Sequence, residues 1–218
     1  MTLARSLAAE FAGTALLLAV IVGSGIMGER LAAGNVAVTL LANSLATGLG
    51  LFVFIVVFAP ISGAHFNPLV TAAAMMSRQI AFRDGAWFVA AQLAGACLGV
   101  ALANVMFDLA PVALATKHRS GLGLLLGEVV ATFGLVVTIL ATRQRDSVTV
   151  AGAVAAFITA GYWFTSSTSF ANPAVTLARA LTPTFTGIAP ADVPGFIGAQ
   201  FVGTLFAVVF EKIMNKRE

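Results

Sequence analysis

Long uninterrupted apolar stretches dominate this chain. A helix needs roughly 20 mainly apolar residues to cross the hydrocarbon core of a bilayer. Six stretches reach that length, so we expect six membrane-spanning helices, at about 6–28, 36–59, 85–107, 120–142, 148–165 and 193–214. Two further apolar stretches, at about 67–78 and 172–181, are too short to cross.

Both short stretches open on an Asn-Pro step. Asn is a strong N-cap and Pro is favoured at the first helical position, so each step predicts a helix that begins abruptly inside apolar sequence. Two half-helices that begin at the bilayer midplane would direct their positive ends and free N–H groups into a central pore. The two motifs are Asn67-Pro68-Leu69 and Asn172-Pro173-Ala174.

The segments before these steps, 60–66 and 165–171, are polar and poor in helix formers. Irregular backbone at membrane depth is tolerated only inside protein or beside a water-filled cavity. We therefore expect two loops that re-enter from opposite faces and present carbonyl oxygens to a solute. The alternative is that both are ordinary surface loops.

The chain repeats itself weakly. The order Glu-x-x-x-Thr, Asn-Pro, Gln-x-x-Gly occurs once in residues 1–115 and again in residues 116–218. Each half contributes three spans, an odd number, so the second copy would enter the membrane inverted. Inverted repeats place the functional site where the halves meet, near the midplane.

The composition is that of an integral membrane protein, with 59% hydrophobic and 10% charged residues and a mean hydropathy of +0.98. We expect one transmembrane domain over 1–218, in the inner (plasma) membrane, with the lipid bilayer and no nucleic acid as partner. The bias of Lys and Arg places both termini in the cytoplasm. The net charge of +3 therefore reflects the orientation of the chain in the membrane. The inner set would be Arg5, Arg78, Arg83, Arg143, Arg145, Lys212, Lys216 and Arg217, and the outer set Arg30, Lys117, Arg119 and Arg179.

The first apolar stretch, preceded by Arg5, could instead be a cleavable signal peptide. No convincing small-residue cleavage site precedes Glu29, and Glu10 inside the stretch fits a functional span better.

Four ordered motifs give the chain a resemblance to the aquaporin and aquaglyceroporin superfamily, and the match covers essentially its whole length. The resemblance implies an all-α membrane fold, a right-handed bundle of six transmembrane helices with two re-entrant half-helices. It also implies a homotetramer of channels and passive flow of small neutral solutes. The motifs lie at 9–14, 61–68, 170–174 and 198–203.

The sequence departs from that family's pattern in two places. Leu69 replaces the usual Ala of the first motif, and Val175 follows the second motif where most members carry an Arg that narrows the outer pore. Family spacing puts the other filter positions at Thr47, Ala160 and Ser169. All four filter residues are small or medium and uncharged, so we expect an unusually wide filter. It would pass water, glycerol-like polyols, urea, or uncharged metalloid hydroxides such as arsenite, with methylated forms also suited to its apolar surface.

Five polar residues within or beside the spans have candidate roles. Asn67 and Asn172 would donate amide hydrogens to a passing oxygen. Glu10 and Glu128 are intramembrane acids, either a proton relay or, as we prefer, acceptors for loop N–H groups. His65 would line the pore or fix its loop, with gating as the alternative.

Arg179, one helical turn beyond Val175, could restore positive charge at the outer mouth or contact lipid or loop. Tyr162 and Trp163, near the end of the fifth span, fit an interfacial aromatic belt.

Other functions fit less well. A secondary transporter can also be built on an inverted repeat, but it needs a coupling-ion site, and Glu10 and Glu128 are the acidic residues within the spans apart from Glu211 near the end of the last one. An enzyme or metal site would need clustered ligands, and His65, Cys97 and His118 lie on separate segments. We therefore expect no enzyme activity, no cofactor and no metal.

Overall fold

The computed structural model describes residues 2–214, and within that range the chain is helical with no strands. The six long helices are α1 (Leu3–Leu31), α2 (Val36–Ser62), α4 (Phe82–Met106), α5 (Leu122–Thr142), α6 (Ser147–Phe164) and α8 (Val193–Met214). All six are long and apolar enough to cross a membrane, as expected. The predicted half-helices are α3 (Pro68–Met76) and α7 (Pro173–Arg179), and a short 3₁₀ turn, η1 (Pro190–Asp192), precedes α8.

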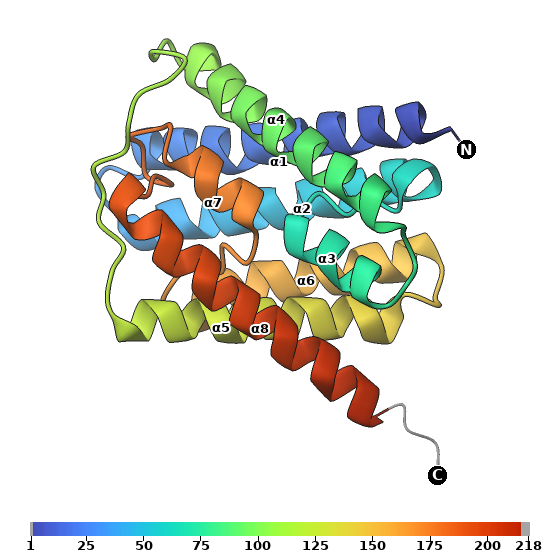
Figure 1. The fold of residues 1–218 in the computed structure, drawn as a ribbon. Helices are drawn as coiled ribbons and strands as arrows, with labels where there is room; N and C mark the ends of the chain where they lie inside the picture. Colours follow the sequence, from blue (N-terminus) through green and yellow to red (C-terminus); the bar gives the residue numbers. More distant parts are fainter. Residues whose placement is uncertain (1, 215–218) are drawn as a thin grey trace.

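The long helices form two groups that enclose the short ones. α1 packs against α2 and α4, α5 packs against α6 and α8, and α2 contacts α6 across the bundle. α3 and α7 contact each other in the middle, each also packed on a long helix (Figure 1). This arrangement brings the two Asn-Pro motifs, far apart in sequence, to the centre of the molecule.

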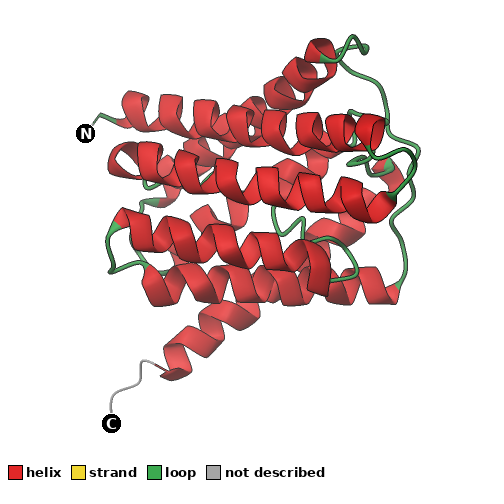
Figure 2. Ribbon diagram, turned by 180° about the vertical axis from the view of Figure 1, so that it is seen from behind, coloured by secondary structure: helices red, strands yellow, loops and turns green. Residues whose placement is uncertain are grey.

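The two ends of the bundle differ. The start of α1 and the end of α8 lie at one end, which we call the inner end (Figure 1). The long segment 107–121 runs along the opposite end, the outer end, from α4 to α5 (Figures 1 and 2). Lys216 and Arg217, assigned to the inner set by the charge bias, lie outside the described residues.

Small residues allow the closest helix crossings. A Cβ added to Gly95 of α4 would lie 2.3 Å from the carbonyl oxygen of Phe11, and one added to Gly203 of α8 would lie 2.4 Å from that of Val129. Side chains at these positions would separate the helices, so backbone-to-backbone contact is part of the fold. The α1–α4 and α5–α8 crossings are therefore alike, since in each a glycine lies against the backbone of the neighbouring helix.

Candidate functional site

The half-helices begin as the Asn-Pro steps predict. The Asn67 side-chain oxygen accepts the N–H of Leu69 at 2.9 Å, and the Asn172 oxygen accepts the N–H groups of Ala174 and Val175 at 2.9 and 3.3 Å. Pro68 and Pro173 occupy the first helical positions, where a missing N–H removes no helix hydrogen bond.

Each capping Asn also bonds to the opposite loop. The Asn67 amide donates to the carbonyl oxygen of Ala171, and the Asn172 amide donates to that of Phe66, both at 2.8 Å. The two half-helices are thereby joined tip to tip by reciprocal bonds. An amide nitrogen carries two hydrogens, so each Asn retains one donor beyond this bond.

The backbone before each motif adopts conformations that are uncommon for these residues. Ala64 and Phe66 in the first loop, and Ser169 and Ala171 in the second, have φ between 48° and 52°. These pairs stand three and one residues before the respective Asn. Non-glycine residues in this region cost about 1–3 kcal/mol each and persist only where the surroundings fix them.

The two intramembrane acids supply that fixation. The Glu10 carboxylate accepts the N–H groups of His65 and Phe66 at 2.9 and 2.8 Å, the Ser62 hydroxyl at 2.6 Å and the Gln92 amide at 2.7 Å. A carboxylate with this many donors is satisfied although it is fully buried.

Glu128 repeats the arrangement in the second half. It accepts the N–H groups of Phe170 and Ala171 at 2.9 and 3.0 Å and the Gln200 amide at 2.5 Å. Neither acid lines the central cavity, which favours loop support over a proton relay.

A central cavity of about 440 Å³ passes the tips of the half-helices. Its lining runs from Arg143 and Arg145 at the inner end, past Asn67 and Asn172, to Arg179 near the outer end. Apolar residues line most of the wall and a few polar groups interrupt it, which is the pattern of small-molecule sites. Leu69 is buried but does not line the cavity, so its extra bulk lies outside the passage.

Three of the four filter positions predicted by spacing line this cavity: Thr47, Ser169 and Val175. The hydroxyl oxygen of Ser169 is buried, has no hydrogen-bond partner in the described part of the chain, and lies against Gly161 of α6, 2.7 Å from a Cβ built on that glycine. His65 also lines the cavity, and its Nδ1 lies 3.0 Å from the hydroxyl of Thr71 on α3.

The fourth predicted position, Ala160, is wrong. Ala160 is exposed and absent from the cavity wall, whereas Tyr162 is only 3% exposed and lines the cavity. The Tyr162 hydroxyl lies 3.2 Å from that of Thr47. Tyr162 therefore does not belong to an interfacial belt, and an aromatic side chain lies on the cavity wall in place of Ala160. Trp163 next to it is half exposed and donates its indole N–H to Ser44.

A sequence signal for Tyr162 exists. The residues of α6 on the cavity wall, beyond Ser147 at its start, are Val150, Val154, Ile158 and Tyr162, four apart, which is one face of a helix. Following that apolar spacing would have identified the tyrosine.

Arg179, the last residue of α7, turns inward rather than toward lipid. It is 2% exposed and lines the cavity, its Nε donates to the carbonyl oxygen of Thr186 at 2.5 Å, and its guanidinium lies 3.4 Å from the centre of the Phe170 ring. Val175, one helical turn earlier on α7, is apolar and buried.

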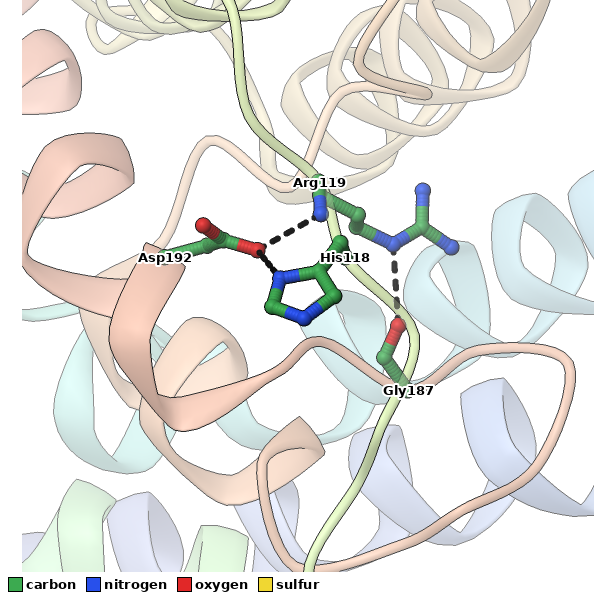
Figure 3. A network of polar contacts seen from close by, with 4 residues as sticks. All are labelled: His118, Arg119, Gly187 and Asp192. Carbon is green, nitrogen blue, oxygen red and sulfur yellow. Dashed lines mark hydrogen bonds and ion pairs between the residues drawn. The ribbon is translucent and has the colours of Figure 1, made fainter.

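The outer loop is bound to the segment before α8. The backbone N–H of Arg119 donates to Asp192 at 2.7 Å, and the same carboxylate oxygen lies 3.2 Å from Nδ1 of His118 (Figure 3). Arg119 Nε donates to the carbonyl oxygen of Gly187 at 2.9 Å. Sequence reasoning assigned Arg119 only to the outer charge set, because its partners depend on the path of two loops.

The sequence is similar to one described protein family and to individual proteins of known name. The family described as "Major intrinsic protein" matches residues 1–166. The chain is 50% identical over 206 residues to "Aquaglyceroporin AqpS" of Rhizobium meliloti (strain 1021), covering 94% of this chain and 88% of that protein. It is 36% identical over 143 residues to "Probable aquaporin TIP2-2" of Oryza sativa subsp. japonica, covering 63% of this chain and 56% of that protein.

Among solved structures, the chain is similar to the aquaglyceroporin from Plasmodium falciparum. The TM-score is 0.77 over 99% of this chain and 96% of that one, at 20% sequence identity. At that identity the likeness concerns the fold.

Proposed function

The chain belongs to the major intrinsic protein family, and from that premise we propose that it is a passive channel for water and for uncharged solutes larger than water. The solute class comprises glycerol-like polyols, urea and uncharged metalloid hydroxides such as arsenite, including methylated forms. We place it in the plasma membrane as a homotetramer with both termini cytoplasmic.

The observation that carries the proposal is Val175 on the cavity wall. An Arg at this position, one residue after the second motif, would extend a long cationic side chain across the passage beside Ser169 and Asn172. Val leaves that volume free and adds apolar surface, so a solute with both hydroxyl and methyl groups meets matching surfaces.

Polar groups around the same level suit a hydroxylated solute. Thr47 and Tyr162 bring two hydroxyl groups to the cavity wall, and Asn67 and Asn172 each retain an amide hydrogen near the half-helix tips. Both donors and acceptors are thus available along the route, as a molecule that must shed its water requires.

Arg179 complements this set with positive charge. Its buried guanidinium lies at the outer end of the cavity, and we propose that it opposes entry of cations in place of the absent filter Arg. Because Arg179 lies one helical turn beyond Val175, its charge would exclude cations without narrowing the cavity beside Val175.

Proteoliposome permeability measurements test the proposal. Vesicles with the wild-type chain should pass water, glycerol, urea and arsenite faster than protein-free vesicles. Val175→Arg should suppress the larger solutes and leave water flow measurable, because the added side chain narrows the passage. Val175→Leu, which adds apolar bulk without charge or length, should retain most glycerol flow.

Two outcomes would contradict the proposal. Wild-type vesicles that pass water but none of the larger solutes would reject the solute class. Equal glycerol flow through wild type and Val175→Arg would remove Val175 from the determinants of width.

A further inference from the structure

The Phe170 ring contacts two arginines that come from distant parts of the chain. The guanidinium carbon of Arg179 lies 3.4 Å from the ring centre, and that of Arg119 lies 5.0 Å from it. The ring is buried and meets Phe196 edge-on at 5.1 Å between centres. The ring therefore packs against α8 as well as against the two cations.

The same two arginines share one stretch of backbone. Arg119 donates to the carbonyl oxygens of Phe185 and Gly187, at 3.4 and 2.9 Å, and Arg179 donates to the carbonyl between them, that of Thr186. Alternate carbonyls of 185–187 thus bind one guanidinium and then the other. The acceptor of Arg179 depends on a segment that Arg119 fixes.

No carboxylate forms an ion pair with either guanidinium within residues 2–214. Burial, and then the positive charges of Arg119 and Arg179, lower the pKa of Lys117, while Glu29 opposes the shift. Three basic side chains therefore lie near one another at the outer end. Two like charges close together repel, and the ring face and the three carbonyls offset that repulsion.

The Arg179 side chain has free donors. Thr186 supplies its hydrogen-bond acceptor within the described part of the chain, through Nε, so the terminal nitrogens remain for the cavity that the residue lines. The Phe170 ring and the Thr186 carbonyl fix the guanidinium and so determine the direction of its free N–H groups.

We infer that Arg119 of the outer loop is a positioning residue for Arg179. Through the Phe170 ring and the carbonyl groups of 185–187, Arg119 fixes the position of the Arg179 guanidinium. The inference rests on the proposed function of Arg179. It makes the outer loop, anchored by Asp192 on the backbone N–H of Arg119, part of the selectivity device rather than a simple connection (Figure 3).

The test measures cation leak and the glycerol-to-water permeability ratio in proteoliposomes. Arg179→Ala should increase cation leak and raise the ratio. Arg119→Ala should shift both quantities in the same direction, and the double variant should match Arg179→Ala alone, since a positioning residue has nothing left to position. Arg119→Lys should resemble Arg119→Ala, because an ammonium cannot bind two carbonyls as a planar fork does.

Arg30 offers a matched control. It lies on α1 at the same end of the molecule, its guanidinium is 5.1 Å from the centre of the Phe107 ring and it donates to the Phe107 carbonyl at 2.7 Å, yet it does not line the cavity. Arg30→Ala removes the same kinds of contact and should leave leak and ratio unchanged. If Arg119→Ala is not recovered as folded protein, Arg119→Gln, with a donor but no charge, carries the test.

Two results would overturn the inference. One is an unchanged cation leak and permeability ratio in folded Arg119→Ala or Arg119→Gln. The other is a cation leak in the double variant that is larger than that of Arg179→Ala alone. Unchanged behaviour of Arg179→Ala would reject the proposed role of Arg179 itself, on which the inference rests. An effect of Arg179→Ala without one of the Arg119 variants would reject the positioning role alone, so the two failures are distinguishable.

Discussion

At the scale of single residues, the phenol ring of Tyr162 lies on the cavity wall. Tyr162 is buried beside Thr47, with the two hydroxyl oxygens 3.2 Å apart, while Ala160 two positions earlier is exposed. A helix turns about 100° per residue, so two positions rotate a side chain by roughly 200°, from the wall to the outside.

Paired substitutions separate the two positions. Tyr162→Ala removes the ring from the passage and should raise glycerol permeability relative to water, whereas Ala160→Phe adds a ring outside the cavity and should change neither. Stopped-flow light scattering of proteoliposomes gives both permeabilities. An effect of Ala160→Phe without one of Tyr162→Ala would restore the position that family spacing selects.

The residues that sequence reasoning found are those whose roles follow from local chemistry. Asn67 and Asn172 cap helices, and the paired acids Glu10 and Glu128 need donors wherever they are buried. Arg119 could not be found in this way, because its partners Gly187 and Asp192 are 68 and 73 positions away. Such contacts depend on how two loops cross, for which no periodicity exists.

Helix crossings without side chains determine the architecture at the scale of elements. α8 can approach α5 because Gly203 lies against the backbone of Val129 and Phe133, whereas Gly198 on the same helix has no neighbouring atom within 4 Å of an added Cβ. The sequence pattern Gly-x-x-x-Gly or Ala-x-x-x-Gly predicts small faces, and the crossings of α4 and α8 agree with it.

Two alanine substitutions on α8 measure this contact. Gly203→Ala should destabilise the protein by about 1–3 kcal/mol, because the added Cβ meets backbone atoms that cannot rotate away. Gly198→Ala should be neutral or stabilise by up to about 1 kcal/mol, since alanine favours the helix. Thermal unfolding in detergent, followed by loss of monodisperse protein, compares the two. If Gly203→Ala were instead as neutral or stabilising as Gly198→Ala, helix propensity rather than close approach would dominate at both positions.

The whole molecule is organised by the equivalence of its halves. Gln92 donates to Glu10 and Thr71 in the first half, and Gln200 donates to Glu128 and Thr176 in the second. The positions of the spans follow from hydropathy, and the pairing of the half-helices follows from the repeated Asn-Pro. The inner wall of the pore follows from neither, since it depends on how each helix is rotated about its axis.

This equivalence bears on the choice between a channel and a secondary transporter. A transporter needs a coupling-ion site that is open to the pathway. The carboxylates of Glu10 and Glu128 are occupied by loop N–H groups, and neither lines the cavity. None of the described residues that form the cavity wall is acidic. The described cavity wall therefore carries no carboxylate that could bind a coupling cation.

Uptake kinetics distinguish the two mechanisms. Initial glycerol uptake into proteoliposomes should rise linearly with concentration and should be unaffected by an imposed proton gradient, because a continuous cavity needs no conformational cycle. Glu128→Gln, where it folds, should leave this linearity unchanged, since the carboxylate supports a loop and carries no coupled proton. Saturable uptake that a proton gradient accelerates, and that Glu128→Gln abolishes, would instead show that the acids are coupling sites and that the inverted repeat operates by alternating access.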